Sequence, residues 1–167
     1  MAFHPLLVEA GLETPHAIQT CFSDMRENRR ESGMSANNDR GDHEGGCECG
    51  ALRYRVTGEA YDAGYCHCRI CQRTSGAPLQ AFARIKADQF AYTKGKPEIY
   101  FSSEHGQREF CAACGSQLLY RGRQAPFDVA FNTPTLDDPL AFPPRQHVWY
   151  RSRLAWFETA DTLPRKD

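Results

Sequence analysis

Long apolar runs are missing from this chain of 167 residues. The longest are fragments such as Leu6-Leu7-Val8, far below the roughly 18 residues that a membrane-spanning helix needs. A large excess of one charge is missing as well, since the formal net charge is −1. The first absence excludes a transmembrane helix, and the second gives no support to a generic binder of nucleic acid or anionic membranes.

Lysine and arginine are missing from residues 1–20, which include Glu9, Glu13, His4 and His16. A secretory signal begins with a basic stretch, followed by roughly 7–15 apolar residues. The sequence therefore predicts no such signal. We expect a cytoplasmic protein whose thiols stay reduced.

Apolar side chains are almost absent between residues 24 and 46. Residues 1–45 carry eight acidic and four basic side chains, whereas residues 46–167 carry thirteen acidic and sixteen basic ones. Such a polar stretch buries too little surface to offset its ordering entropy. We therefore predict that residues 1–44 are a disordered or upstream leader, with Met25 or Met34 as alternative starts, and that residues 45–165 form one domain.

Short segments bounded by turn residues fill the rest of the chain. Residues 51–57 alternate between apolar and polar side chains and end at Gly58, as in a half-buried strand. Only residues 69–75 and 87–92 look helical. The sequence predicts a mainly β domain with few short helices. Its further strand candidates are 79–85, 98–102, 107–110, 117–121, 127–132 and 147–150.

Cysteine is the residue that the chain has in excess, with eight copies. In a reducing compartment clustered thiols are most often metal ligands, and pairs this close in sequence fit poorly into a regular disulfide framework. Metal is therefore preferred over structural disulfides. The cysteines are Cys21, the pair Cys47 and Cys49, the triplet Cys66, Cys68 and Cys71, and the pair Cys111 and Cys114.

The two pairs together offer four thiolates, the set that a tetrahedral zinc prefers. Cys47 and Cys49 point to one face if their segment is extended. Cys111 and Cys114 have the two-residue spacer of a zinc knuckle, with Gly115 behind it. A closed structural zinc site built from both pairs would contribute roughly 10–16 kcal/mol, comparable with the whole stability of a small domain.

The triplet Cys66, Cys68 and Cys71 can hold one ion from a single loop. Cys21 is the one cysteine left to complete it, and we interpret Cys21 as an incidental thiol of the leader. Three protein ligands and an open position are typical of a catalytic zinc, which binds and ionises water or a thiol. His67 lies between two ligands, so its side chain is expected to point away from the metal.

Other readings of the same thiols stay open at this point. The C-x-x-C spacings also occur in redox dithiols, and four thiolates also hold iron–sulfur clusters, although the flanking elements and spacings fit neither well. A structural two-zinc module is the main competitor, serving as a non-catalytic domain that binds protein or nucleic acid. Its second site would be closed by His67, His105 or His147.

Three segments resemble the glutathione-dependent formaldehyde-activating enzyme family, also called the centromere-protein-V-like family. They are GGCECGALRY at residues 45–54, CHCRICQRTSGA at 66–77 and FCAACGS at 110–116. The tail is similar to the family's C-terminal signature, with HVW at 147–149, LAWF at 154–157 and LP at 163–164. The resemblance covers residues 45–165 and includes seven cysteines in the family's order and spacing.

This resemblance implies a fold of several small coiled antiparallel sheets with two zinc ions per chain. It also implies carbon–sulfur lyase chemistry, in which formaldehyde and glutathione join as S-hydroxymethylglutathione. The family's structural zinc would be held by Cys47, Cys49, Cys111 and Cys114, and its catalytic zinc by Cys66, Cys68 and Cys71. The expected partners are therefore a small thiol such as glutathione and an aldehyde, whereas a nucleic acid or a membrane is not expected.

Substrate contacts are harder to read from the sequence. Arg69 and Arg73 flank Cys71 and are candidates for the carboxylates of glutathione, although solvated surface arginines explain them equally well. Ser75 and Gly76 follow the metal loop and are candidates to line the pocket. The alternatives for His147 and Trp149 are core and pocket wall, with core preferred.

Overall fold

The structure is a computed structural model that describes residues 41–124 and 127–167. The predicted leader, with Cys21, therefore lies almost wholly outside the described residues. Within the described residues, no helix has the length and apolar character needed to cross a membrane.

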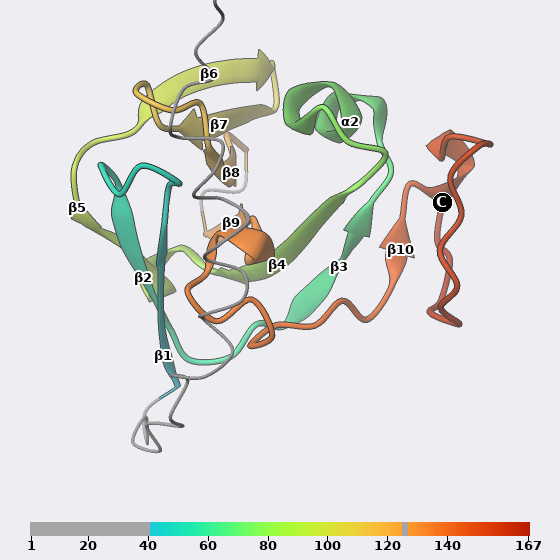
Figure 1. Ribbon diagram of the computed structural model, residues 1–167, viewed down its shortest axis with the longest axis horizontal. Coiled ribbons are helices and arrows are strands. Elements are labelled where there is room, and N and C mark those ends of the chain that lie inside the picture. Colours follow the sequence, from blue (N-terminus) through green and yellow to red (C-terminus); the bar gives the residue numbers. More distant parts are fainter. Residues whose placement is uncertain (1–40, 125–126) are drawn as a thin grey trace, which may run out of the picture. The chain divides into compact units, whose positions relative to one another are not determined.

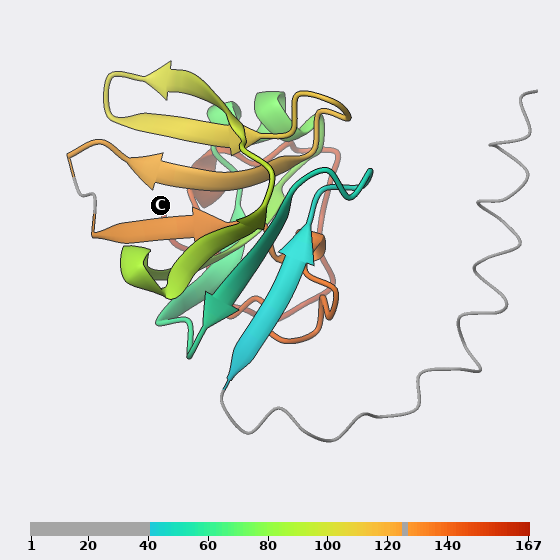
Figure 2. The ribbon, with the colours of Figure 1, turned by 90° about the vertical axis from the view of Figure 1, so that its left-hand side faces the viewer.

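A three-stranded antiparallel sheet forms from β1 (Asp42–Gly46), β2 (Arg53–Thr57) and β5 (Phe90–Lys94), in the order β1-β2-β5. Strands β1 and β2 pair from Asp42 opposite Thr57 to Gly46 opposite Arg53. Figure 2 shows these strands in front of the second sheet. The connection between β1 and β2, residues 47–52, carries the first cysteine pair, Cys47 and Cys49.

A seven-stranded sheet has the order β10-β3-β4-β9-β8-β7-β6 (Figure 1). Neighbouring strands are antiparallel, except that β10 runs parallel to β3. The strands are β3 (Asp62–Cys66), β4 (Gln80–Lys86), β6 (Glu98–Ser103), β7 (Gly106–Phe110), β8 (Gln117–Gly122), β9 (Asp128–Phe131) and β10 (His147–Val148).

One buried apolar cluster joins the two sheets. Tyr54 of β2 stacks on Phe90 of β5 at a ring separation of 4.9 Å and contacts Phe131 of β9 at 6.3 Å. The Tyr54 hydroxyl is satisfied by Thr135 Oγ1 at 2.7 Å, so this aromatic side chain can be fully buried. The cluster also includes Cys47 and Cys111, one thiol from each of two cysteine loops.

Helix α2 (Arg69–Ser75) is the one α-helix of the described residues, and three short 3-10 helices accompany it. Cys68 caps its N-terminus by accepting a hydrogen bond from the backbone N–H of Cys71. Gly76 ends it in the left-handed conformation, at φ +64°. The 3-10 helices are η1 (Ala87–Gln89), η2 (Thr133–Thr135) and η3 (Tyr150–Ser152).

The mainly β class and the helix at 69–75 are confirmed. The helix predicted at 87–92 is wrong, because only η1 is helical and Phe90–Lys94 pairs with β2 as a strand. Two further strands, Asp42–Gly46 and Asp62–Cys66, were not predicted from the sequence. Strand β1 begins at Asp42, three residues before the predicted domain boundary at residue 45.

The C-terminal segment docks on β3 where that strand carries a glycine. A Cβ atom at Gly64 would lie 2.6 Å from the carbonyl oxygen of Gln146, so only glycine allows this approach. The neighbouring N–H of Tyr65 donates to the same carbonyl at 2.8 Å. The close contact places β10 and its His147 beside the strand that ends at Cys66.

Candidate metal centre

Four thiols from two distant loops come together in the structure. Their sulfur atoms all lie within 4.8 Å of one another. The Cys47 and Cys111 side chains are buried, whereas the other two face solvent. The four are Cys47, Cys49, Cys111 and Cys114.

The two loops have a similar backbone. In residues 47–52 the N–H of Cys47 donates to the carbonyl of Leu52 at 3.1 Å, and in residues 111–116 the N–H of Cys111 donates to the carbonyl of Ser116 at 2.9 Å. The second loop turns at Gly115, whose φ of +78° is rare for residues with a side chain. Each half of the cluster is therefore held by a hydrogen bond within its own loop.

Ser116 links the two loops, a role that sequence reasoning missed. Its hydroxyl oxygen accepts a hydrogen bond from the backbone N–H of Glu48 at 3.1 Å and lies 3.2 Å from the Cys114 sulfur. The hydrogen bond from Ser116 lowers the pKa of Cys114 to about 6. A thiolate is therefore favoured at this position, as a metal ligand requires.

The donor set fits a zinc ion. Zinc–sulfur bonds of about 2.3 Å in a tetrahedron separate the ligand sulfurs by roughly 3.8 Å. The Cys47–Cys49 and Cys49–Cys111 sulfur pairs are 3.5 Å and 3.8 Å apart. All seven described cysteines are free thiols, so these contacts are not disulfides. The cluster can hold a metal ion.

A second cluster of three thiols lies where β3 meets α2. Cys66 ends the strand, Cys68 caps the helix and Cys71 stands in its first turn, so one strand-to-helix corner presents all three. The Cys66 side chain is buried, and the other two are partly exposed.

Within the triplet one thiolate is favoured, at Cys68, whereas the hydrogen bonds with Cys68 raise the pKa of Cys66 and help to raise the pKa of Cys71. Hydrogen bonds from the neighbouring thiols of Cys66 and Cys71 lower the pKa of Cys68 to about 2. The backbone N–H of Cys71 adds a hydrogen bond to the Cys68 sulfur at 3.3 Å. Three soft donors on one side of a shared point suit zinc, so this cluster too can hold a metal ion.

No fourth Cys, His, Asp or Glu donor joins the triplet among residues 41–124 and 127–167. The imidazoles of His67 and His147 hydrogen-bond to each other at 2.8 Å. His105 is exposed and pairs with Glu104 instead. None of the three histidines considered for closing a structural site is therefore part of this cluster.

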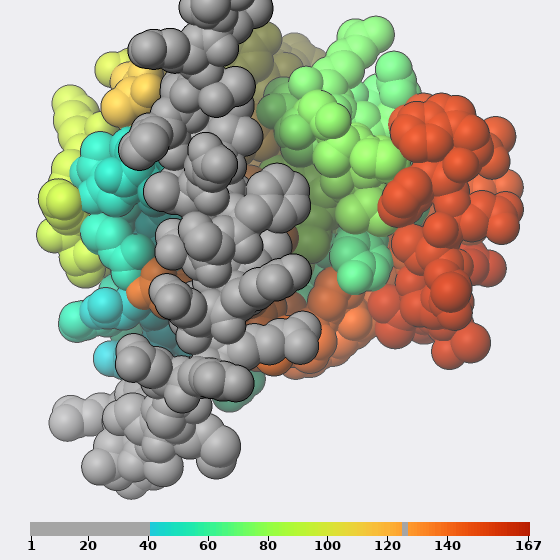
Figure 3. Space-filling view, in the orientation of Figure 1, coloured from blue at the N-terminus to red at the C-terminus, as the bar shows by residue number. Residues whose placement is uncertain are grey.

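A buried chain of hydrogen bonds runs behind the triplet. His147 Nε2 lies 3.0 Å from Asp161, and His147 Nδ1 lies 2.8 Å from His67 Nε2. When both imidazoles are neutral, the carboxylate accepts the Nε2 proton of His147, whose Nδ1 then accepts from His67. Both rings are buried, which confirms the core interpretation of His147. Figure 3 shows the red C-terminal segment against the green metal-loop segment.

Asp161 ends the hydrogen-bond chain through His147 and His67, and we expect Asp161→Asn to lower the midpoint of thermal unfolding. The hydrogen bond from His147 lowers the pKa of Asp161 to about 2, so its stabilisation is complete above about pH 4 and is lost as the pH falls towards 2. The difference in midpoint between wild type and variant should therefore be equal at pH 6 and pH 8. Glu158→Gln, at an exposed site of the same segment, is the control; equal midpoints for both variants and wild type would contradict the role.

Arg108 of β7 also reaches the triplet, and no sequence signal pointed to it. Its Nη2 lies 3.4 Å from the sulfur of Cys71, and its Nη1 lies 3.5 Å from Gln117 Oε1. Gln80 Nε2 donates to Gln117 at 3.0 Å and to Asn132 at 2.6 Å. Gln80 stands opposite Cys66 in the β3–β4 register. This polar network therefore connects the triplet with β8, the strand that follows Cys111 and Cys114.

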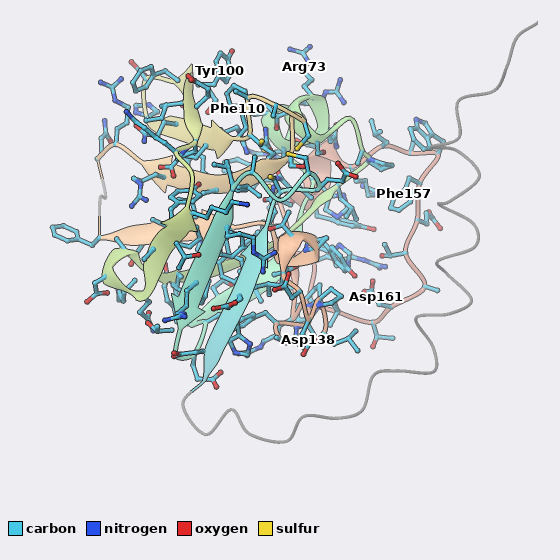
Figure 4. The ribbon with its side chains drawn as sticks, turned by 60° about the vertical axis from the view of Figure 1, so that its left-hand side comes forward. Arg73, Tyr100, Phe110, Asp138, Phe157 and Asp161 are labelled. Atoms are coloured by element: carbon cyan, nitrogen blue, oxygen red, sulfur yellow. The ribbon has the colours of Figure 1, made fainter. Side chains whose placement is uncertain are left out.

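The residues predicted to contact the substrate lie in helix α2 or at its C-terminal end. Arg69 hydrogen-bonds to Gln72, and Arg73 projects away from the ribbon in Figure 4. Ser75 is exposed and donates to the Cys71 carbonyl at 2.7 Å, at the far end of the helix from Cys68. Trp149 is 48% exposed, so the preference for a core position is wrong there.

Comparisons with known proteins agree with this geometry. A family model described as "Glutathione-dependent formaldehyde-activating enzyme" matches residues 42–152. A Halomonas elongata protein named "Putative glutathione-dependent formaldehyde-activating enzyme" is 30% identical over 124 residues, which cover 69% of this chain and 79% of that protein.

Two further similarities are more limited. An uncharacterized lyase of Schizosaccharomyces pombe is 28% identical over 79 residues, which cover 47% of this chain and 57% of that protein. A crystal structure of a Rhodobacter sphaeroides protein has a TM-score of 0.48 and 24% identity, and the match covers 57% of this chain and 88% of that one.

Proposed function

We propose, because the chain belongs to the glutathione-dependent formaldehyde-activating enzyme family, that it is a zinc-dependent carbon–sulfur lyase acting on a thiol–aldehyde adduct. The adduct would be S-hydroxymethylglutathione or a close relative. The observation that carries the proposal is the triplet of thiols that lacks a fourth protein donor among residues 41–124 and 127–167. The same chain also contains a cluster of four thiols, which would leave no ligand position open on a tetrahedral zinc ion, whereas the triplet would leave one.

The two clusters would hold one zinc ion each, with different roles. Cys47, Cys49, Cys111 and Cys114 would hold a structural ion that joins the β1–β2 and β7–β8 connections. Cys66, Cys68 and Cys71 would hold the catalytic ion. When bound there, zinc supplies Lewis acidity and lowers the pKa of a thiol or water at the open position.

The reaction needs no oxidant or reductant. In the synthetic direction the thiol sulfur bonds to the carbonyl carbon of formaldehyde, and the thiol proton ends on the carbonyl oxygen. In the lyase direction that carbon–sulfur bond breaks, the carbonyl re-forms and the proton returns to sulfur. The strand end at Cys66 and the helix turn at Cys71 fix the three thiols on rigid elements, which limits reorganisation during either direction.

We also propose that the catalytic domain comprises residues 45–165, extended at its start by strand β1 from Asp42. Residues 1–40 would then be dispensable for activity. Comparing the full chain with a version that begins at residue 41 tests this: equal exchange rates are expected, and loss of activity would overturn it.

The function is tested by exchange spectroscopy with labelled formaldehyde and glutathione. The zinc-loaded chain is expected to accelerate exchange between free thiol and the hydroxymethyl adduct, and metal removal should abolish the acceleration. Other thiols and aldehydes are run beside this pair. Acceleration only with another pair would exclude the named substrate, and acceleration with none would overturn the lyase assignment.

A further inference from the structure

Arg108 is a buried charge with no carboxylate partner in the described part of the chain. Its side chain belongs to a residue only 5% exposed, and no Asp or Glu oxygen of residues 41–124 and 127–167 comes within ion-pair distance of it. The neighbouring Glu109 pairs with Arg121 instead, at 3.0 Å. Arginines are rarely buried this deeply unless a negative group compensates the charge.

The guanidinium of Arg108 instead contacts a sulfur atom of the thiol triplet. Nη2 points at the Cys71 sulfur at 3.4 Å, while Nε is sealed from solvent and has no hydrogen-bond partner in the described residues. The guanidinium also lies over the Tyr120 ring, 5.4 Å from its centroid, which holds it in place. Because its inner nitrogen is enclosed, the side chain is placed to act on Cys71 rather than to grip a substrate from solution.

Charge counting shows what this contact does when the site is loaded. Three thiolates and one divalent cation carry a net charge of −1, and the guanidinium brings the total to zero. Arginine keeps its charge at every physiological pH, so this compensation does not depend on a titration. A fourth ligand that is itself an anion then enters a neutral site, rather than one that already repels it.

We propose that Arg108 is a positioning residue that compensates the charge of the triplet and makes its open position select an anionic ligand, such as the thiolate of a small thiol. The inference rests on the proposed function, because it requires a divalent metal at Cys66, Cys68 and Cys71. It goes further by assigning the ligand's charge class to a residue that contacts the cluster from a different strand.

The test compares an anionic and a neutral probe on the full chain loaded with Co²⁺, whose visible spectrum reports the open position. Thiocyanate is the anion and imidazole is the neutral ligand. In Arg108→Gln we expect thiocyanate affinity to fall by roughly ten- to hundredfold, while imidazole affinity changes less than about twofold. Arg108→Lys keeps the charge and should restore most of the thiocyanate affinity.

Gln117→Glu provides a second route if Arg108→Gln does not fold. The new carboxylate would stand at the atom that already lies 3.5 Å from Arg108 Nη1, and it would still accept the hydrogen bond from Gln80. It should pair with the guanidinium and weaken thiocyanate binding as Arg108→Gln does. The charge changes while Arg108 itself stays in place.

The outcomes separate this inference from the proposed function. If the variants weaken both probes equally, or neither, Arg108 does not select charge and the inference is overturned while the open site stands. If neither probe alters the spectrum of the wild-type protein, the open position itself is disproved, and the proposed function falls together with the inference.

Discussion

Cys111→Ser is expected to unfold the domain at 25 °C. Cys111 is 2% exposed and is shared between the apolar core and the four-thiol cluster, so serine would lose a metal ligand and bury a hydroxyl. A zinc site contributes roughly 10–16 kcal/mol, which is comparable with the roughly 5–15 kcal/mol of stability that a whole domain has. Amide chemical-shift dispersion and a urea titration would measure the loss.

The matched control is Ala112→Ser, which introduces the same side chain at the next residue. Ala112 is exposed and is not part of the cluster, so this variant should unfold within about 0.5 kcal/mol of wild type. A Cys111→Ser protein that kept its dispersion and its full metal content would contradict the structural role of the four-thiol cluster.

Cys68→Ser is expected to have the opposite pattern, with activity lost and the fold kept. The substitution removes one of only three donors in the triplet, and two thiols hold zinc weakly. We expect bound zinc to fall by one ion per chain and exchange activity to fall by at least about a hundredfold. Because the four-thiol cluster is untouched, the thermal midpoint should change far less than in Cys111→Ser.

Ala77→Ser serves as the control for this experiment, since it lies just beyond the same helix and offers no ligand. It should keep its zinc and its activity. If Cys68→Ser retained both ions and full activity, the triplet would not be the catalytic site, whatever the four-thiol cluster does.

Strands with regular alternation could be predicted from the sequence, and the others could not. Residues 53–57 alternate between buried and exposed side chains in the structure as in the sequence pattern. Strand β3 reads Asp-Ala-Gly-Tyr-Cys, and its glycine, Gly64, is required because Gln146 passes against it. That contact joins residues far apart in sequence, so no local pattern announces it. Phe90 follows a 3-10 turn directly, which made a strand resemble the end of a helix.

The cysteines could be grouped from spacing because each loop brings its own thiols together. The meeting of the two outer pairs across 62 positions, with Cys49 and Cys111 sulfurs 3.8 Å apart, then follows from the need for four ligands. Arg108 has no such signature. Its place beside Cys71 depends on how β7 packs against the β3–α2 corner, and in the sequence it is one charged residue within an ordinary polar strand.

X-ray absorption at the zinc edge tests the central claim of one closed and one open site most directly. For the zinc-loaded chain the account predicts two ions per chain with an average of about 3.5 sulfur neighbours each, the mean of a four-thiolate and a three-thiolate site. Adding glutathione should raise the average to about 4. An average of four sulfurs that glutathione leaves unchanged, or a single zinc ion per chain, would contradict it.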